Sequence, residues 1–242
     1  MTDPDRSAPA PSTLIPRVGL AVLVVAGVLG TRAWMRWPDV RSVVRGRPEH
    51  VAVIDREEAA TGALVNRLWT DLRDISPQLA LAVLVAEDIE FYQHRGFSWA
   101  EIRSAMADAR AGRRMRGAST ITQQLAKNLW LSPERSAARK LAEAALAADL
   151  ERFAGKRRIL ELYLNVVQFG PGAFGAEAAA RRYFGKPALF LTEAESAMLA
   201  AGLTQPSRWN PASTHPDYQA RVELIRRRMI NAEFLWRHLL QL

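Results

Sequence analysis

Three carboxylates directly after an apolar segment are the residues best placed for acid–base chemistry in this sequence. Glu87, Asp88 and Glu90 follow the segment 79–86, whose apolar residues recur with helical spacing. A carboxyl group at the end of such a helix is partly removed from water, and we expect this to raise its pKa into the range that suits a general base. The alternative is a solvated C-terminal turn. Three acids at a helix C-terminus oppose the helix dipole, however, and such a local conflict is typical of functional sites.

A second polar group lies at 117–131, where hydroxyls and amides surround a single cation. If 120–130 is a helix, one face carries Thr120, Gln124, Lys127 and Asn128, and another carries Ile121, Leu125 and Leu129. Directional donors beside one positive charge suit a diphosphate or sugar hydroxyls, whereas an ordinary solvated stripe is richer in Glu and Lys pairs. The N-terminus of this helix is expected to offer further N–H donors to an anion.

A third candidate pairs Arg139 with Glu143, four residues apart on one helical face. The simpler interpretation is a surface ion pair that contributes about 0.3–0.5 kcal/mol. Before it in the chain, the segment 111–117 places three arginines between two glycines. That segment is either a solvated linker or a mobile flap over an anionic lipid or diphosphate, and on its own it favours the linker.

Composition excludes several other chemistries. The chain has no cysteine, which rules out disulfides, thiolate metal sites and cysteine nucleophiles. His94 has no second histidine at metal-ligand spacing, so we reject a zinc site and assign no metal ligands. The formal net charge of +8 over 242 residues favours anionic partners such as nucleic acid, acidic lipid or phosphate-bearing substrates.

The elements expected around these residues are almost all helices. Helix start signals stand at Ser76-Pro77 and Ser132-Pro133, and capping boxes at Thr120–Gln123 and Thr192–Glu195. The periodicity predicts helices at 77–87, 98–111, 120–130, 133–153, 156–168, 174–184, 192–202 and 216–240. The segment 49–54 alternates partly and predicts a short strand. The expected fold class is a mainly α globular domain.

The N-terminal segment predicts a membrane anchor. Residues 1–13 are rich in Pro, Ser and Asp and predict a disordered tail, and the apolar run 18–30 extends to Trp37 if two arginines snorkel. Since no A-x-A cleavage site follows, we expect an uncleaved transmembrane anchor over 14–37 and a folded domain over 38–242. More arginines follow the run than precede it, so the positive-inside rule alone would place the C-terminal flank in the cytoplasm.

Together these segments resemble the peptidoglycan glycosyltransferase family, whose lysozyme-like domain is also found in bifunctional penicillin-binding proteins. The resemblance covers roughly 75–211 and rests on five motifs in order. They are E-D-x-x-F-x-x-H-x-G (Glu87, Asp88, Phe91, His94, Gly96), G-x-S-T-I-T-Q-Q-L-x-K-N (Gly117–Asn128), R-K-x-x-E (Arg139, Lys140, Glu143), a fourth block from Tyr163 to Gly185 and a fifth from Glu193 to Pro211. Two departures are Ala118, where a second glycine is usual, and Ser98, where the family often has Asp.

The resemblance implies an enzyme that polymerises lipid II with inversion and releases undecaprenyl diphosphate. It implies that Glu87 is the general base on the acceptor 4-hydroxyl, and that Glu143 is a second catalytic residue that orients cations or the donor. The cations that would neutralise the diphosphate are Lys127, Arg139 and Lys140. The other substrate-binding candidates are the site-shaping Asp88, Phe91 and His94 and the positioning residues Ser119, Thr120, Gln123, Gln124 and Asn128.

The same resemblance implies no tightly bound cofactor, and a divalent ion such as Mg²⁺ that assists the diphosphate. The implied partners are lipid II, the lipid-linked glycan chain, the membrane and other cell-wall synthesis proteins, with no nucleic acid. The chain lacks the Ser-x-x-Lys and Lys-Thr-Gly signatures of a transpeptidase, so it resembles the monofunctional form. It is expected in the bacterial inner membrane, single-pass, with the catalytic domain on the periplasmic side. We prefer this orientation to the charge-based one because lipid II is polymerised outside.

Two other functions stay open from the residues alone. A DNA-binding helical protein would use the high pI and the arginines at 226–228, but no helix-turn-helix turn is evident. A lysozyme-like peptidoglycan hydrolase would use Glu87 and Glu143 as its paired carboxylates. The nearby lysine and arginines instead favour an anionic leaving group, which the substrate of a hydrolase lacks.

Overall fold

The computed structural model of the chain describes residues 37–99, 103–104, 107, 110–111, 119–134 and 136–240. No helix within these ranges is long and apolar enough to cross a membrane. The anchor expected at 14–37 lies, except for Trp37, outside the described residues, as do half of the helix expected at 98–111 and most of the segment 111–117. The chain divides into two compact units after Asp39, and the described helices and strands belong to the second.

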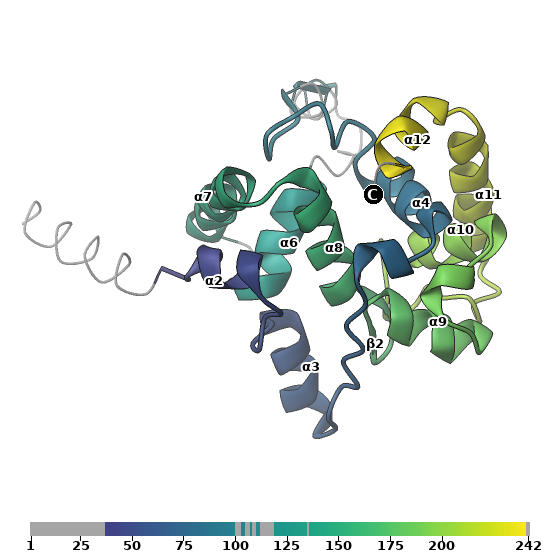
Figure 1. Cartoon of the computed structure of the whole chain (residues 1–242), viewed down its shortest axis with the longest axis horizontal. Helices are drawn as coiled ribbons and strands as arrows, with labels where there is room; N and C mark the ends of the chain where they lie inside the picture. Colours follow the sequence, from purple (N-terminus) through teal and green to yellow (C-terminus); the bar gives the residue numbers. More distant parts are fainter. Residues whose placement is uncertain are drawn as a thin grey trace, which may run out of the picture. The chain divides into compact units, whose positions relative to one another are not determined.

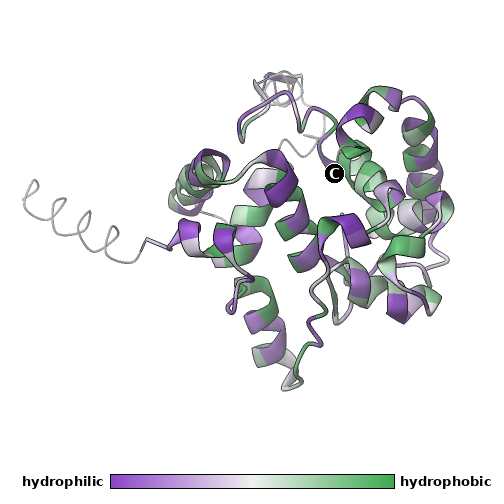
Figure 2. Ribbon diagram, in the orientation of Figure 1, coloured by the Kyte–Doolittle hydropathy of each residue, from purple (hydrophilic) through white to green (hydrophobic). Residues whose placement is uncertain are grey.

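Helix α4 (Pro77–Glu87) is a buried element that ends at the first candidate carboxylate. It begins as predicted, with a proline in the first turn and the Ser76 hydroxyl accepting a hydrogen bond from the Gln78 N–H at 3.3 Å. Every residue from 79 to 85 is buried, and Figure 2 shows the helix hydrophobic along most of its length. A helix that is apolar all round must be enclosed by other elements, so its last residue, Glu87, is carried into the molecule.

Helices α6 (Ile121–Trp130) and α7 (Ala137–Phe153) carry most of the other candidate residues. The predicted capping box at the start of α6 is present. The predicted start of the next helix at Ser132-Pro133 is wrong, because the Ser136 hydroxyl caps α7 by accepting a hydrogen bond from the Arg139 N–H at 3.1 Å. A second serine four residues later thus supplies the cap, and α7 begins about one turn later than predicted.

The strand expected at 49–54 is also wrong, because helix α3 (Ala52–Thr61) occupies its second half. Val51 and Ile54 are both buried and stand three residues apart, which is a helical spacing as well as a broken alternation. The helix ends where Gly62 adopts a left-handed conformation with φ of 69°. The residues that follow Ile54 continue the helix, and the six residues 49–54 are too few to distinguish this helical spacing from a broken alternation.

The remaining helices and strands complete the domain. They are α2 (Val40–Arg45), the 3₁₀ turn η1 (Leu72–Asp74), α8 (Lys156–Val166), the antiparallel strands β1 (Gln168–Gly170) and β2 (Ala173–Phe174), α9 (Ala176–Phe184), the 3₁₀ turn η2 (Ala188–Phe190), α10 (Glu193–Gly202), α11 (Pro216–Ile230) and α12 (Glu233–Leu239). The single helix predicted at 216–240 is therefore two, separated at Asn231 and Ala232. The second predicted capping box is present at the start of α10. The mainly α fold class is confirmed.

Two groups of helices meet where the candidate residues lie (Figure 1). In one group α6 packs against α3, α7 and α8, and in the other α4 packs against α10, α11 and α12. Glu87 comes from the second group, whereas Gln124, Lys127 and Glu143 come from the first. One hydrophobic core cluster includes residues of both groups, so close packing fixes how these side chains face one another.

Candidate active site

Glu87 is a largely buried carboxylate held by donors from two other helices. The Gln124 amide on α6 donates to Glu87 Oε2 at 2.9 Å, and Arg221 Nη2 on α11 donates to Oε1 at 3.1 Å. Only 14% of the Glu87 side chain is exposed. Burial raises the pKa of Glu87, although the hydrogen bond from Gln124 and the charges of Arg221 and Lys127 oppose the rise. Glu87 is therefore a stronger base than an exposed glutamate, with cations that favour its ionised form.

A buried tyrosine fixes the orientation of the Gln124 amide. The Tyr163 hydroxyl on α8 donates to Gln124 Oε1 at 2.9 Å, which leaves the amide nitrogen facing Glu87. Burial raises the pKa of Tyr163 well above its usual range, and the charges of Glu87 and Asp88 raise it further. Tyr163 therefore stays protonated at neutral pH and remains a donor to Gln124.

Asp88 lies at the N-terminus of α6 and occupies donors that were expected to bind a substrate anion. Its Oδ2 accepts a hydrogen bond from the Ile121 N–H at 2.9 Å, and its Oδ1 lies 2.9 Å from His94 Nε2. The Gln123 N–H is likewise taken, by the Thr120 hydroxyl at 3.2 Å. The expected anion at this helix terminus is thus the protein's own Asp88. The apparent conflict with the dipole of α4 is resolved, because the same carboxylate is favourable at the positive end of α6.

Thr120, Gln123 and Gly96 join the loop after α4 to the start of α6. The Thr120 hydroxyl donates to the Gly96 carbonyl at 2.7 Å, and the Gln123 side-chain carbonyl accepts from the Thr120 N–H at 3.1 Å. Gly96 has a φ of +87°, and a Cβ there would lie 3.3 Å from Glu151 Cγ on α7, so only glycine suits the approach of α7. Thr120 and Gln123 therefore hold the site together, and direct contact with substrate stays a prediction for them.

Cations of α7 enclose the second carboxylate, Glu143. Arg139 Nη1 donates to Glu143 Oε2 at 2.6 Å, and Lys140 Nζ donates to Oε1. Only 4% of the Glu143 side chain is exposed, so the surface ion pair considered from the sequence is wrong. Lys140 also donates to the Ser119 hydroxyl at 3.1 Å. The Arg139 Nε–H is buried without an acceptor in the described part of the chain.

Lys127 lies within electrostatic reach of both carboxylates. Solvent reaches its side chain. Partial removal of the side chain from water by the surrounding protein nevertheless lowers the pKa of Lys127. The negative charge of Glu143 opposes this lowering, and the positive charges of Arg139 and Lys140 add to it. Glu87 also acts on Lys127 and opposes the lowering. Among the described residues no ion-pair partner contacts Lys127, so its charge is available to a ligand.

Two of the predicted substrate contacts are buried. The Phe91 ring lies beneath Lys156, whose Nζ is 4.4 Å from the ring centroid, so Phe91 shapes the loop as expected. Asn128 follows Lys127 on α6 and is only 9% exposed. A contact of Asn128 with substrate stays a prediction.

Arg221 is the site residue that the sequence did not indicate. It stands 134 residues after Glu87 in a helix that carries several other arginines, and only the packing of α11 against α4 brings the two together. Its Nε–H is buried without an acceptor in the described part of the molecule. Nothing in its local sequence sets it apart from the other arginines of α11, so only the folded structure identifies it as a site residue. Tyr163 was noted only as part of the fourth motif.

The carboxylates of the site do not fit a protein-bound metal. Within the described residues no three His, Asp or Glu side chains converge to hold an ion. Glu87 accepts from Arg221, and Glu143 accepts from Arg139 and Lys140, so both anions already face cations. A divalent ion that arrived with a diphosphate would therefore have the diphosphate oxygens as its ligands rather than these side chains.

Comparison with known proteins gives the family. A model of the family described as transglycosylase matches residues 55–230, which include every residue discussed above for the site. The biosynthetic peptidoglycan transglycosylase of Rhodospirillum centenum is 43% identical over 211 residues, or 87% of this chain and 86% of that protein. The protein of the same name from Azoarcus sp. is 46% identical over 204 residues, or 83% of this chain and 86% of its own length. That from Shigella boydii serotype 4 is 49% identical over 162 residues, or 66% of this chain and 67% of its own length. The chain therefore belongs to the transglycosylase family, as its five motifs predicted.

Proposed function

We propose that this transglycosylase polymerises lipid II into linear glycan strands, with inversion at the donor sugar and with undecaprenyl diphosphate as the leaving group. The observation that carries the proposal is the pairing of a buried, basic carboxylate with a separate cationic cluster. Glu87 suits removal of a proton, and Lys127 with the cations around Glu143 suits an anion that departs. The names of the related proteins support peptidoglycan as the polymer that is made.

In the proposed step, Glu87 takes the proton of the acceptor 4-hydroxyl. The acceptor oxygen forms a bond to the anomeric carbon of the donor from the side opposite the diphosphate. The bond from that carbon to the phosphate oxygen breaks, and its electron pair leaves with the diphosphate. Gln124 and Arg221 orient Glu87 and favour its charged form before the proton moves.

The leaving diphosphate gains charge as the bond breaks, and the cations stabilise it. Lys127 is exposed and has no ion-pair partner among the described residues, so it can bind phosphate oxygens without losing an existing contact. The Arg139 Nε–H has no acceptor among the described residues and would supply a further donor if the side chain turned toward the diphosphate. Glu143 accepts from Arg139 and Lys140 and so fixes their direction. Mg²⁺ bound to the diphosphate would add charge neutralisation, and the step above does not depend on it.

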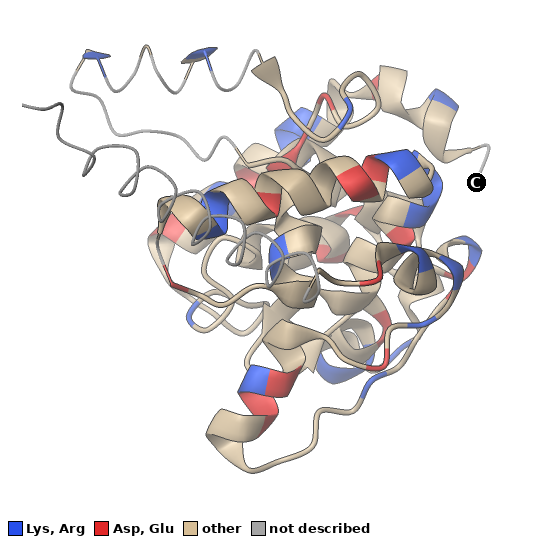
Figure 3. Cartoon of the chain, turned by 90° about the vertical axis from the view of Figure 1, so that its left-hand side faces the viewer, with Lys and Arg blue, Asp and Glu red and all other residues tan. Residues whose placement is uncertain are grey.

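The two other functions are less well supported. A hydrolase of this type needs one carboxylic acid to protonate a leaving alcohol. Glu143 accepts hydrogen bonds from two cations, which suits an ion-pair partner rather than a proton donor. In a DNA-binding protein the arginines of α11 would be free for phosphates. Here Arg226 and Arg227 pair with glutamates, Arg228 donates to a backbone carbonyl, and Figure 3 shows basic and acidic residues interspersed.

We also propose the membrane arrangement expected from the sequence. Residues 1–13 would be cytoplasmic, 14–37 would cross the inner membrane, and 38–242 would act on the periplasmic side, where the lipid-linked substrate is presented. Deleting residues 1–37 should release the protein from membrane fractions. Full retention of the shortened protein would refute the anchor.

The proposed reaction is tested with purified full-length protein and labelled lipid II in detergent. Wild type should form glycan polymer, and Glu87→Gln should lose at least about 100-fold in rate, as expected for a general base. Glu233→Gln, which removes an exposed carboxylate on α12, is the matched control and should polymerise normally. Polymer from Glu87→Gln at the wild-type rate would refute the base. Cleavage of preformed glycan without polymerisation would favour the hydrolase.

A further inference from the structure

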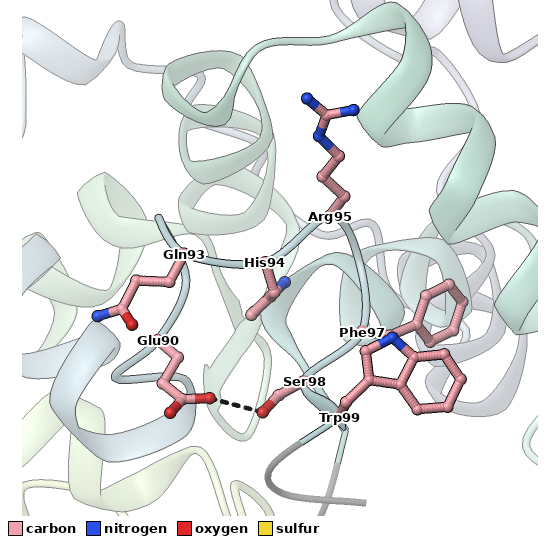
Figure 4. Close-up of a pocket in the computed structure, with 7 residues that line it drawn as sticks. All are labelled: Glu90, Gln93, His94, Arg95, Phe97, Ser98 and Trp99. Atoms are coloured by element: carbon pink, nitrogen blue, oxygen red, sulfur yellow. Dashed lines mark hydrogen bonds between the residues drawn. The ribbon is translucent and has the colours of Figure 1, made fainter.

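A polar pocket of about 380 Å³ lies in the loop that follows Glu87 and is not used by the reaction above. Figure 4 shows Glu90, Gln93 and Ser98 on one side of it and the rings of Phe97 and Trp99 on the other. The volume lies at the low end of the range for small-molecule sites, so the chemistry of the lining decides what the pocket can bind.

Glu90 supplies the only carboxylate among the described residues that line this pocket. It accepts a hydrogen bond from the buried Ser98 hydroxyl at 2.7 Å on Oε2, and no ion pair joins Glu90 to any other described residue. Arg95 also lines the pocket but points away from Glu90 in Figure 4. The contact also bears on Ser98, which stands where the family often has Asp. In this chain the carboxylate of Glu90 lies next to Ser98, near where the side chain of that Asp would be.

Trp99 adds an aromatic surface to this carboxylate. Its residue is 69% exposed, although Trp is a largely buried residue on average. A carboxylate and an exposed indole that line one pocket are a combination that can recognise an ammonium group, through an ion pair and a cation–π contact. A diphosphate would be repelled by Glu90, so the pocket differs in chemistry from the cluster of Lys127, Arg139 and Lys140.

The pocket is joined to the site through His94. This ring lines the pocket, and its Nε2 lies 2.9 Å from Asp88 Oδ1. Asp88 in turn follows Glu87 directly and accepts from the first N–H of α6. A group held in the pocket would therefore lie against the loop that directly follows the general base.

We infer that this pocket binds a primary ammonium group on the peptide of the lipid-linked substrate, with Glu90 as the ion-pair partner and Trp99 as the aromatic wall. The inference rests on the proposed function and adds a determinant of substrate specificity to it. A peptide whose side-chain amine is free would be preferred over the same peptide with an amide in its place.

The test compares two synthetic lipid II substrates that differ only at the peptide side-chain amine, which is free in one and acetylated in the other. Full-length wild type should show a kcat/KM about fivefold to tenfold higher for the free amine, the range expected for one partly exposed ion pair with a cation–π contact. Glu90→Gln keeps an acceptor for Ser98 and should reduce that ratio to about one. Trp99→Leu should reduce it in part, and Glu233→Gln should leave it unchanged.

The outcomes separate this inference from the proposed function. Polymerisation of both substrates by wild type with equal kcat/KM would overturn the ammonium pocket while leaving the polymerase intact. The ammonium pocket would also be overturned if Glu90→Gln lowered kcat/KM for both substrates by the same factor, because Glu90 would then act on a group other than the amine. Failure of wild type to polymerise either substrate would refute the proposed function itself.

Discussion

Replacing Arg221 tests whether a residue distant in sequence tunes the general base. Arg221→Gln removes the charge that faces Glu87 Oε1 at 3.1 Å but keeps an amide that can donate to it. Both side chains are mostly buried, with 25% of Arg221 and 14% of Glu87 exposed, so water screens the pair only partly. The interaction should therefore exceed that of an exposed ion pair.

The expected magnitude follows from the direction of each effect on Glu87. Burial raises its pKa and Arg221 opposes the rise, so loss of Arg221 should raise the pKa of Glu87 further. An opposite charge at this distance shifts a carboxyl pKa by roughly 1–3 units, and partial exposure favours the low end. Glu87 must be ionised to accept a proton, so the acidic limb of kcat/KM should move to higher pH by about one unit. On that limb the rate at a fixed pH should fall about tenfold.

The assay is the pH dependence of lipid II polymerisation by full-length protein at limiting substrate. Arg227→Gln is the matched control, because Arg227 stands on the same helix and pairs with Glu223 at 3.0 Å with 73% of its side chain exposed. The control should leave the acidic limb in place. An unchanged limb in Arg221→Gln, with circular dichroism like that of wild type, would refute the idea that Arg221 tunes Glu87.

Three further predictions concern stability and the cationic cluster. Because the pKa of Glu87 is raised in the folded state, its ionisation costs stability from near the ordinary glutamate value of about 4.3 up to its folded pKa. The Tm of Glu87→Gln minus that of wild type should therefore increase between pH 4 and 8 in scanning calorimetry, and a flat or falling difference would contradict the raised pKa. Glu143→Gln should lower polymerisation by about 100-fold, since Arg139 and Lys140 lose the acceptor that directs them; near-normal turnover would reduce Glu143 to a structural ion-pair partner. Gly175→Ala should lower the free energy of unfolding by more than about 1 kcal/mol, because Gly175 has a φ of +85° and a Cβ there would lie 2.8 Å from the Asn165 carbonyl oxygen. Gly46→Ala, whose added carbon would lie 3.5 Å from the Ser42 carbonyl oxygen in ordinary van der Waals contact, is its control, and equal Tm values for the two variants would refute the strain.

The sequence was sufficient for those parts of the fold that local signals determine. The start of α4, the capping boxes of α6 and α10 and the apolar face of α6 all depend on residues within one or two turns of each other. The errors arose where two local signals competed. Ser132-Pro133 and Ser136 both resemble a helix start, and 49–54 fits both a broken alternation and one helical turn. Tertiary packing decided between them.

The site shows the same division. Spacing alone placed Gln124 and Lys127 on one face of α6, whereas only the family resemblance linked Glu87 on α4 to them. Spacing could not show that Asp88 would occupy the N-terminal donors of α6, since the two segments are 33 residues apart. It also could not single out Arg221, whose partner is fixed by the packing of α11 on α4. Contacts of this kind depend on the whole fold.

The most direct measurement of the central claim is the separation of chemistry from binding in Glu87→Gln. The amide keeps the shape of the side chain but removes its ability to take a proton, together with the charge that faces Arg221, so binding has to be measured separately from chemistry. With lipid II as substrate, kcat should fall by about 10²- to 10⁴-fold while the Kd for a non-reactive lipid II analogue changes by less than about threefold. A variant that turns over at the wild-type kcat, or that loses activity only through weaker binding of the analogue, would contradict the assignment of Glu87 as the general base.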